Sequence, residues 1–397
     1  MRQALRGDNL KRKIDVSAAI VLIVAAAFLS FAAGCWFVLS RIPHGTKMDE
    51  VMAIIERVYV GEYSREELEE QASAAMVDAL GDRWSYYLTE EVLQQYLQDM
   101  DNEYYGIGLT VQQQDGVITV YDVAPDSPAA QAGILPGGEL KSVDGQSVEG
   151  MNTDGVKALV QAGIAEGEVV LTILRDGELD EYSLSGEVIK VDPVRYEMID
   201  NVGYIKVKNF DARSAEQMIA ACETLVGQGA SGLVFDLRFN PGGQLDELLK
   251  VLDYILPEGD IFLSKVKGGE MEVERSDAKC LEMPMAVLVN GESYSAAEFF
   301  AAALQEYDWA KVVGEQTTGK GYAQRTIMLD DGGAVHISAK EYFTPNGISL
   351  ADVGITPDIQ ADIEDEPWML LYYDMLELEE DPQLQAALAV IKEAATE

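Results

Sequence analysis

Ser295 is the residue whose setting most directly suggests nucleophilic catalysis. It stands where an apolar strand predicted over residues 286–290 gives way to a helix predicted over residues 296–305. A serine on such a turn faces the positive end of the helix, where backbone N–H groups can stabilise an oxyanion. The same position also suits a helix N-cap, with Glu298 completing a capping box. Ser295 alone therefore leaves catalysis and capping both open.

Lys320 lies 25 residues further along, between Gly319 and Gly321, with few charges near it in the sequence. Only its neutral form could accept a proton from a serine. Burial would lower its pKa from the usual value of about 10.4, because burial penalises the ammonium form. The alternative is a phosphate-binding loop, since Gly314 to Lys320 fits the pattern Gly-x4-Gly-Lys. Gly321, however, replaces the Ser or Thr that would hold magnesium, and no helix is predicted to follow.

A third element, Asn240-Pro241-Gly242-Gly243, directly follows an apolar strand predicted over residues 233–237. Its paired glycines can turn a backbone N–H toward a reacting carbonyl oxygen. One such donor contributes about 3–4 kcal/mol to transition-state stabilisation. By itself the motif is more typical of a plain turn.

The supply of histidine bears on the choice of base, because most serine hydrolases use one. The sequence contains only two, His44 and His336. His44 adjoins the apolar N-terminal segment, and His336 falls in a strand-like run over residues 334–339, where a core or edge position is expected. A lysine base needs neither residue, so the histidine count favours a Ser–Lys pair.

The region over residues 101–185 has short β-rich runs separated by glycine-rich turns. It opens on Tyr105-Gly106-Ile107-Gly108-Leu109, where the glycines let successive N–H groups converge on an anionic carboxylate. The strand that follows could accept an extended peptide by β-augmentation. Ser127 and Pro128, followed by Gly133, predict a short helix, and a longer helix is predicted over residues 153–162.

The remaining elements are read from hydrophobic periodicity. Three amphipathic helices are predicted between residues 47 and 100, the second over residues 64–80 and the third over residues 90–100. From residue 202 onward apolar strands alternate with helices, which is typical of an α/β layout. A last helix is predicted over residues 381–396.

The N-terminal segment predicts the compartment. Residues 16–39 are 24 consecutive residues without a charge, and as a helix they would reach about 36 Å, more than the roughly 30 Å of a bilayer core. The first thirteen residues contain five basic residues and one acidic residue, so the positive-inside rule puts this end in the cytoplasm and the rest outside. A cleaved signal peptide and a lipoprotein signal ending at Cys35 remain open alternatives.

Composition narrows the class of protein. A formal net charge of −40 repels phosphate, so nucleic acid is not an expected partner. Hydrophobic residues make up 48%, enough for folded cores. Cys222 and Cys280 lack the spacing of metal ligands, so no metal site is expected. A disulfide between them is possible, but two buried thiols are the favoured interpretation.

Along the chain, residues 240–243, Ser295 and Lys320 follow a PDZ-like segment in that order, and together they closely resemble the C-terminal processing peptidases, also called tail-specific proteases. The resemblance runs from about Val51 to the end and includes three further stretches: Leu80-Gly81-Asp82-Arg83-Trp84-Ser85-Tyr86-Tyr87-Leu88, Tyr342-Phe343-Thr344-Pro345-Asn346-Gly347 and Gly354-Ile355-Thr356-Pro357-Asp358. The segment from residue 105 onward, with Ser127-Pro128-Ala129-Ala130-Gln131-Ala132-Gly133 and Pro136-Gly137-Gly138-Glu139-Leu140, resembles a PDZ domain.

The resemblance implies roles for individual residues. It implies that Ser295 is the nucleophile, Lys320 the general base and Gln324 the residue that orients the lysine. The implied oxyanion donors are the N–H of Ala296 and one glycine of the pair Gly242 and Gly243. The implied peptide-binding residues of the PDZ domain are Tyr105, Gly106, Ile107, Gly108 and Leu109. No cofactor is implied.

Two stretches depart from the family pattern. The nucleophile stretch reads Ser-Tyr-Ser-Ala-Ala-Glu instead of Ser-Ala-Ser-Ala-Ser-Glu, which puts Tyr294 beside the nucleophile. The family often carries an Arg-Gly pair after the second PDZ helix, where this chain reads Val160-Gln161-Ala162-Gly163. The missing arginine puts in doubt how tail binding would be coupled to activation.

We therefore expect a multidomain α/β (α+β) protein, with a PDZ domain inserted before an α/β peptidase core of crotonase-like or ClpP-like layering. The expected segments are a cytoplasmic basic tail (1–13), a transmembrane signal anchor (14–40), an N-terminal helical domain or arm (41–100), the PDZ domain (101–185), the peptidase core (186–365) and a C-terminal helical segment (366–397).

The expected function is that of a membrane-anchored serine endopeptidase. Its PDZ domain would recognise accessible C-terminal tails of proteins or peptides, which a Ser–Lys dyad then cleaves. The expected location is the cell membrane, with a single pass and the catalytic part outside the cytoplasm. The resemblance also implies a homodimer formed through the N-terminal helices. The alternative is a catalytically silent, membrane-tethered PDZ module that binds protein C-termini.

Overall fold

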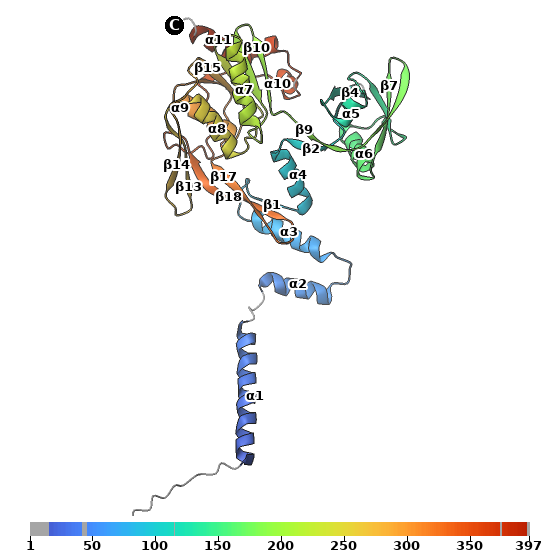
Figure 1. Cartoon of the computed structure of the whole chain (residues 1–397), viewed down its shortest axis with the longest axis vertical. Coiled ribbons are helices and arrows are strands. Elements are labelled where there is room, and N and C mark those ends of the chain that lie inside the picture. The colour runs from blue at the N-terminus through green and yellow to red at the C-terminus, as the bar shows by residue number, and fades with distance from the viewer. Residues whose placement is uncertain (1–15, 42–45, 115, 374, 395–397) are drawn as a thin grey trace, which may run out of the picture. The chain divides into compact units, whose positions relative to one another are not determined.

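The computed structural model describes residues 16–41, 46–114, 116–373 and 375–394, and Figure 1 labels many of their helices and strands. Within the first of these ranges, the side chains of residues 16–19, 22 and 35–41 are not described. The chain divides into two compact units, residues 1–68 and residues 69–397. The boundary falls inside the segment 41–100 that the sequence predicts as one helical domain.

The first unit is helical. It contains α1 (Val16–Arg41), α2 (Lys47–Val58) and the first residues of α3 (Arg65–Asp78). Thr46 caps α2, because its hydroxyl accepts a hydrogen bond from the N–H of Asp49 and the Asp49 carboxylate accepts one from the N–H of Thr46. Four apolar residues of α2 are exposed: Met48, Val51, Ile54 and Val58.

The predicted anchor falls partly outside the described residues. Residues 1–15, which include the whole basic tail, and residues 42–45, which include His44, are not described, and neither is the side chain of Cys35. Where the structure does describe the chain, it contains no helix whose length and apolar character would suffice to cross a membrane.

A small β-rich body in the second unit has its own core. Its sheet has the strand order β3-β4-β5-β7-β8, with β6 paired to β5. The strands are β3 (Leu109–Gln114), β4 (Val117–Val123), β5 (Glu139–Val143), β6 (Gln146–Ser147), β7 (Val169–Arg175) and β8 (Glu178–Leu184), and the helices are α5 (Pro128–Gln131) and α6 (Thr153–Ala165). Alternate residues of β7, Val169, Leu171 and Ile173, point into this core, as a half-buried strand requires.

The chain enters and leaves this body through two paired strands. β2 (Glu103–Gly106) and β9 (Glu187–Lys190) run antiparallel, with Glu103 opposite Lys190 and Gly106 opposite Glu187. The β-rich body is therefore an insertion between α4 (Glu90–Met100) and the strands that follow β9. This position is the one that the sequence predicts for the PDZ domain.

The rest of the second unit is built on a six-stranded sheet of order β10-β11-β12-β15-β16-β19, in which β10 is antiparallel and the other neighbours are parallel. The strands are β10 (Val194–Ile199), β11 (Val202–Val207), β12 (Leu233–Asp236), β15 (Met285–Val289), β16 (Lys311–Gly314) and β19 (Ile359–Gln360). The central strands are apolar on both faces, because helices cover both.

Successive side chains of a strand point to opposite faces of the sheet, which shows on which face of the sheet each helix packs. Leu233 and Phe235 of β12 share a core with three helices: α7 (Ser214–Gly227), α8 (Leu245–Ile255) and α9 (Ala296–Glu306). Val234, which lies between them in the sequence, shares a different core with α11 (Pro382–Ala394). The sheet is therefore a layer between α11 on one side and α7, α8 and α9 on the other.

A second sheet covers the far side of α9. It has the order β1-β18-β13-β14, with β17 also paired to β18. Its strands are β1 (Tyr86–Leu88), β13 (Gly259–Val266), β14 (Met271–Ser276), β17 (Tyr322–Met328) and β18 (Ala334–Phe343). Phe262 of β13 and Tyr342 of β18 pack on Phe299 of α9, with ring centroids 4.8 and 5.7 Å apart. Two short helices, α10 (Asp365–Tyr372) and η1 (Leu378–Glu380), precede α11.

The prediction of a mixed α/β multidomain chain is confirmed. The helix expected over residues 296–305 is α9, and the last predicted helix is α11, which ends at Ala394. The expectation of two buried thiols is wrong for one residue. Cys222 is buried on α7, but Cys280 is exposed, because it follows the edge strand β14 in a surface loop; neither forms a disulfide in the described chain.

Candidate active site

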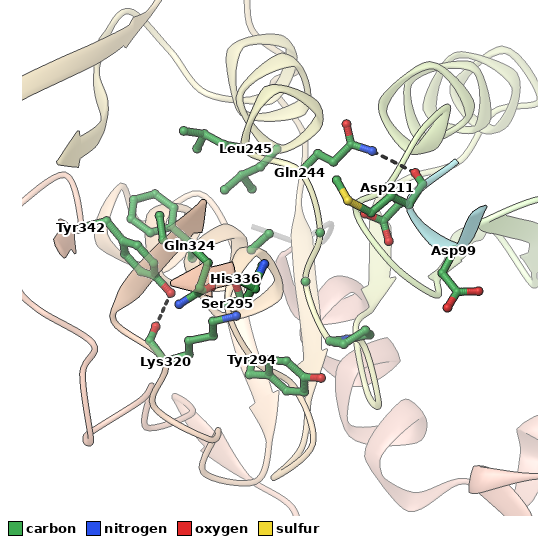
Figure 2. A pocket seen from close by; sticks show the side chains of 18 of the residues that line it. Asp99, Asp211, Gln244, Leu245, Tyr294, Ser295, Lys320, Gln324, His336 and Tyr342 are labelled. Atoms are coloured by element: carbon green, nitrogen blue, oxygen red, sulfur yellow. Dashed lines mark hydrogen bonds between the residues drawn. The ribbon is translucent and has the colours of Figure 1, made fainter. Parts of the chain in front are cut away.

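The elements predicted to carry chemistry meet at one cavity of about 430 Å³. The predicted site residues that line it are Ser295, Ala296, Lys320, Gln324, Gly242 and Gly243. They come from the start of α9, from the loop after β16, from β17 and from the loop after β12. Figure 2 shows the side chain of Lys320 running into this cavity on the side where Ser295 lies.

Ser295 is the last residue of the strained turn that joins β15, which ends at Val289, to α9. Its φ of 59° and ψ of −122° lie in a region that residues with a side chain rarely adopt. Its N–H donates to the Glu298 carboxylate at 3.0 Å. This is the Glu298 contact expected of a capping box, so the cap and the exposed position occur together rather than as alternatives.

The loop after β12 touches the nucleophile turn through Gly242. A Cβ on Gly242 would lie 2.7 Å from the Cβ of Ser295 and 2.8 Å from the N of Ala296, and its φ is +93°. Only glycine fits such a close approach. The loop is held by Asn240, whose side-chain amide donates to Val207 O at 2.8 Å and whose Oδ1 accepts the Gly242 N–H at 2.8 Å.

These contacts distinguish the two glycines as hydrogen-bond donors. The N–H of Gly242 is already bonded to Asn240. The N–H groups of Gly243 and Ala296, in contrast, donate to no other residue of the described chain. Both residues line the cavity. The available backbone donors are therefore those of Gly243 and Ala296, a distinction that the motif alone does not make.

Glu298 joins the nucleophile turn to the lysine loop. Its buried carboxylate accepts hydrogen bonds from Ser295 N, from Thr317 Oγ1 at 2.5 Å, from Gly319 N at 2.6 Å and from Lys320 N at 2.9 Å. Burial raises the pKa of Glu298, and these four hydrogen bonds oppose that effect. The sequence predicts Glu298 only as a capping partner. In the structure it also holds the turn of Ser295 and the loop of Lys320 together.

Lys320 has the environment that a neutral amine requires. Its pKa is lowered from 10.5 to about 8, mainly by burial; the carboxylates of Asp82 and Glu298 oppose this shift, and the nearby Arg83 adds to it. Its amine lies 4.7 Å from the centre of the Trp84 ring and 5.8 Å from that of Tyr294. The Lys320 backbone carbonyl accepts a hydrogen bond from the Tyr342 hydroxyl, drawn in Figure 2.

Gln324 lines the same cavity from β17. Its side-chain amide nitrogen donates to Tyr322 O at 2.8 Å and to Ser338 Oγ at 3.1 Å. Gln324 and Lys320 therefore line one cavity, with no hydrogen bond between them among those of the described residues.

Beyond Ser295 and Lys320, the cavity has two chemically different parts. Apolar side chains line one part: Leu245, Leu248, Phe262, Phe299 and Ala323. Asp99 and Asp211 line another, away from Lys320 in the view of Figure 2. Burial first, and then Asp99, Asp101 and Glu247, raise the pKa of Asp211 to about 7.

His336 also lines the cavity, which the sequence did not predict. It is a buried residue of β18, as expected, stacked on Tyr86 at 4.7 Å with its Nδ1 2.9 Å from Thr326 Oγ1. Burial lowers its pKa to about 4, so it is neutral at physiological pH. The alternation of β18 could have suggested an inward side chain, but not that a cavity lies there.

The loop predicted to bind peptide carboxylates comprises the last two residues of β2 (Tyr105 and Gly106), then Ile107 and Gly108, and the first residue of β3 (Leu109). Its carbonyls at Ile107 and Gly108 accept hydrogen bonds from Ala129 N at 3.0 Å and Ala124 N at 2.9 Å. Gly108 has a φ of +82°, and a Cβ there would lie 2.1 Å from the Cβ of Ser127. β3 pairs only with β4 in the described chain, so its other edge is free to accept an extended peptide.

The stretch that lacks the expected arginine lies within α6. Gln161 donates from its side chain to the carbonyl of Tyr105 at 3.3 Å, so it contacts the predicted carboxylate loop. Gly163 packs tightly, because a Cβ there would lie 2.6 Å from Asp144 Oδ2. In the described residues no three His, Cys, Asp or Glu side chains come together as metal ligands would.

Comparison with protein-family models finds two matches. The model of peptidase family S41 matches residues 201–361, which contain Ser295, Lys320 and the loop after β12. The model of the PDZ domain matches residues 119–175, within the β-rich body.

Comparison with curated and solved proteins finds relatives along most of the chain. The carboxy-terminal processing protease CtpA of Bacillus subtilis is 31% identical over 356 residues, covering 87% of this chain and 76% of that protein. A probable CtpA-like serine protease of Staphylococcus epidermidis is 32% identical over 317 residues, covering 79% and 64%. A putative S41 protease from Bacteroides fragilis shares the fold, with a TM-score of 0.55 at 17% identity over 81% of this chain and 90% of that chain.

Proposed function

Because this chain belongs to the carboxy-terminal processing proteases of peptidase family S41, and so is a serine peptidase with a PDZ domain, we propose that Ser295 is its nucleophile and Lys320 its general base. The observation that carries this proposal is the cavity shared by a serine in a strained turn and a lysine whose pKa is lowered to about 8. Near that pH a substantial fraction of the lysine is neutral and can accept a proton.

The proposed reaction begins when neutral Lys320 takes the proton of the Ser295 hydroxyl and the serine oxygen attacks the scissile carbonyl. The N–H groups of Gly243 and Ala296, which have no other acceptor in the described chain, would stabilise the oxyanion. The lysine ammonium then protonates the leaving amine. In the second half, neutral Lys320 takes a proton from water as the water attacks the acyl-enzyme, and the ammonium returns that proton to the Ser295 oxygen.

Gln324 is proposed to orient the lysine. Its amide nitrogen is held by Tyr322 and Ser338, which directs the remaining side-chain oxygen into the proposed role of acceptor for the Lys320 amine. Oxygen as the acceptor suits an amine whose protons must point away from the Ser295 oxygen.

The proposed substrates are proteins or peptides with accessible C-terminal tails. The loop of Tyr105, Gly106, Ile107, Gly108 and Leu109 would bind the carboxylate, and the free edge of β3 would pair with the tail. The alternative of a catalytically silent PDZ module is not favoured, because the relatives are named as proteases.

Membrane anchoring and dimerisation are part of the same proposal. The uncharged run over residues 16–39 and the basic residues before it support a single-pass anchor with a cytoplasmic N-terminus. The exposed apolar residues of α2 support a homodimer through the N-terminal helices. Fractionation of cells that express the full chain, with and without residues 1–40, tests the anchor; a full chain that stays in the soluble fraction would contradict it.

The catalytic assignment is tested with the full-length chain and an unfolded protein substrate. Ser295→Ala and Lys320→Ala should both abolish cleavage, and a fluorophosphonate probe should label the wild type on Ser295. Lys311→Ala is a matched control, since Lys311 is an exposed residue paired with Asp308 outside the cavity. Wild-type activity should rise with pH to a plateau above about pH 8, because only the neutral base is active. Cleavage that persists in Ser295→Ala would refute the assignment.

A further inference from the structure

The turn Asp82-Arg83-Trp84-Ser85, between α3 and β1, lies next to the proposed general base but takes no part in the reaction as described so far. The turn is held together by Asp82, whose carboxylate accepts the Trp84 N–H at 3.0 Å and the Ser85 hydroxyl at 2.5 Å. Such a side-chain-to-backbone bond over two residues fixes the direction in which the intervening side chains leave the chain. The orientation of Trp84 is therefore set locally.

The turn is also fixed to the sheet that carries Gln324. Ser85 Oγ accepts the backbone N–H of Ser338 at 3.0 Å, and β1 continues from the turn into pairing with β18. Ser338 in turn accepts the hydrogen bond of Gln324 at 3.1 Å. The position of Trp84 relative to the site is thus defined by β18, not by a free loop.

Trp84 reaches the amine of Lys320 from this anchored turn. The amine lies 4.7 Å from the centre of the Trp84 ring. It lies 5.8 Å from the centre of the ring of Tyr294, the residue before the proposed nucleophile. The two rings are 5.5 Å apart at an interplanar angle of 34°. Both distances are within the range of about 6 Å for a cation–π contact. Trp84 is not among the residues that line the cavity.

We propose that Trp84 is a positioning residue for the general base: with Tyr294 it forms an aromatic seat that holds the amine of Lys320 at the cavity, without touching substrate. This inference rests on the proposed role of Lys320. A lysine side chain has four rotatable bonds, and no hydrogen bond from its amine to another described residue is present to fix it. In this structure the two rings, rather than a hydrogen bond, restrain the amine.

The same turn brings two opposite charges to the lysine. The Arg83 guanidinium lies 4.3 Å from the centre of the Trp84 ring, and its charge opposes the ammonium form of Lys320. Asp82 favours the ammonium form, as does Glu298 from α9. His336 on β18 is neutral at physiological pH, and Tyr342 faces the lysine backbone. Adjacent residues of one turn therefore shift the proton affinity of the base in opposite directions.

The first test separates positioning from substrate binding. Trp84→Leu keeps bulk but removes the ring, and should lower kcat of the full-length chain by about tenfold or more while KM stays within about twofold, because a misplaced base costs only transition-state stabilisation. Trp84→Phe keeps a weaker aromatic face and should recover most of kcat. Trp309→Leu, at a ring that follows the C-terminal end of α9 and does not line the cavity, should leave the kcat of folded enzyme unchanged.

The second test uses the charges. Asp82→Asn should move the midpoint of the kcat–pH profile to lower pH, and Arg83→Gln should move it to higher pH, each by more than about 0.3 pH unit. A purely structural role of the turn would not produce shifts of opposite sign. Equal profiles for both variants, or full kcat in Trp84→Leu, would overturn the inference.

The outcomes also distinguish this inference from the proposed function. If Lys320→Ala retains activity, the dyad assignment fails and the seat has no base to hold. If Lys320→Ala is inactive while Trp84→Leu and Trp84→Phe both behave as wild type, the dyad stands and only the aromatic seat is refuted. Thermal unfolding of each variant separates loss of folding from loss of positioning.

Discussion

Asp211→Asn should stabilise the folded protein at alkaline pH. Asp211 lies after β11 at the acidic part of the cavity, partly buried and close to Asp99, Asp101 and Glu247. Burial and these carboxylates raise its pKa from 3.8 to about 7. Asparagine has nearly the same size and carries no charge at any pH, so the substitution removes the repulsion and the burial cost of a charge while keeping the packing.

The magnitude follows from the shift in pKa. The shift is about 3 units, and one unit corresponds to about 1.36 kcal/mol, so the ionised side chain costs at most about 4 kcal/mol of folding free energy. Between about pH 4 and pH 7 the folded state holds the proton that the unfolded state has released. Stability therefore falls as pH rises through that window and then levels off. We expect Asp211→Asn to gain about 2–4 kcal/mol at pH 8 and almost nothing at pH 4.

Urea unfolding of the full-length chain at pH 4, 6 and 8 measures this directly. Because the chain carries a formal net charge of −40, removal of any carboxylate lowers the general repulsion slightly. Asp180→Asn, at an exposed position of β8, calibrates that general effect. A gain at pH 8 no larger than that of Asp180→Asn would refute the reasoning. An equal gain at pH 4 and pH 8 would show that packing, not charge, is responsible.

Three further substitutions test the loops and the last helix. Gly242→Ala should lower kcat at least about 100-fold, because the new Cβ would lie 2.7 Å from the Cβ of Ser295 and displace the oxyanion loop. Gly227→Ala is the control, because open space surrounds Gly227 and kcat should not change. Retained activity in Gly242→Ala would contradict the close approach. Asp381→Asn should destabilise the fold by about 3 kcal/mol in urea unfolding, because it weakens a buried pair with Arg238 at 2.7 Å. Asp200→Asn, which breaks an exposed pair with Lys392, should change little, and equal effects of the two would argue against the buried pair. Gly108→Ala should weaken binding of a C-terminal peptide, measured by fluorescence anisotropy, because the new Cβ would lie 2.1 Å from that of Ser127; unchanged affinity would count against the proposed carboxylate loop.

The elements that carry the site could be read from the sequence because each is specified locally. The apolar run of β15 followed by Ser295 and Glu298 predicts a strand, a cap and a helix, and the structure contains all three. Gly242 and Gly243 predict a sharp turn after β12, and both have a positive φ. Such patterns depend on backbone preferences and side-chain periodicity over a few residues, so a single sequence determines them.

Other features of the site depend on burial and on contacts between distant segments. The sequence leaves Gly242 and Gly243 equivalent as oxyanion donors, and only the bond from Gly242 to Asn240 shows which N–H is occupied. In the sequence, Trp84 is only part of a stretch that resembles the family, with no role assigned to it. The pairing of β1 with β18 is what brings its turn close to Lys320. His336 and Asp211 face the cavity for the same kind of reason.

For this protein, the sequence alone determined the order of the motifs, the family they resemble, the mixed α/β layout and the turn residues around Ser295 and Lys320. The tertiary structure decided which backbone N–H groups remain available, how far the pKa of Lys320 falls and which aromatic rings surround its amine. The physical reason is that local chain preferences act within a few residues. Desolvation and long-range contacts, in contrast, exist only once the sheets and helices have packed.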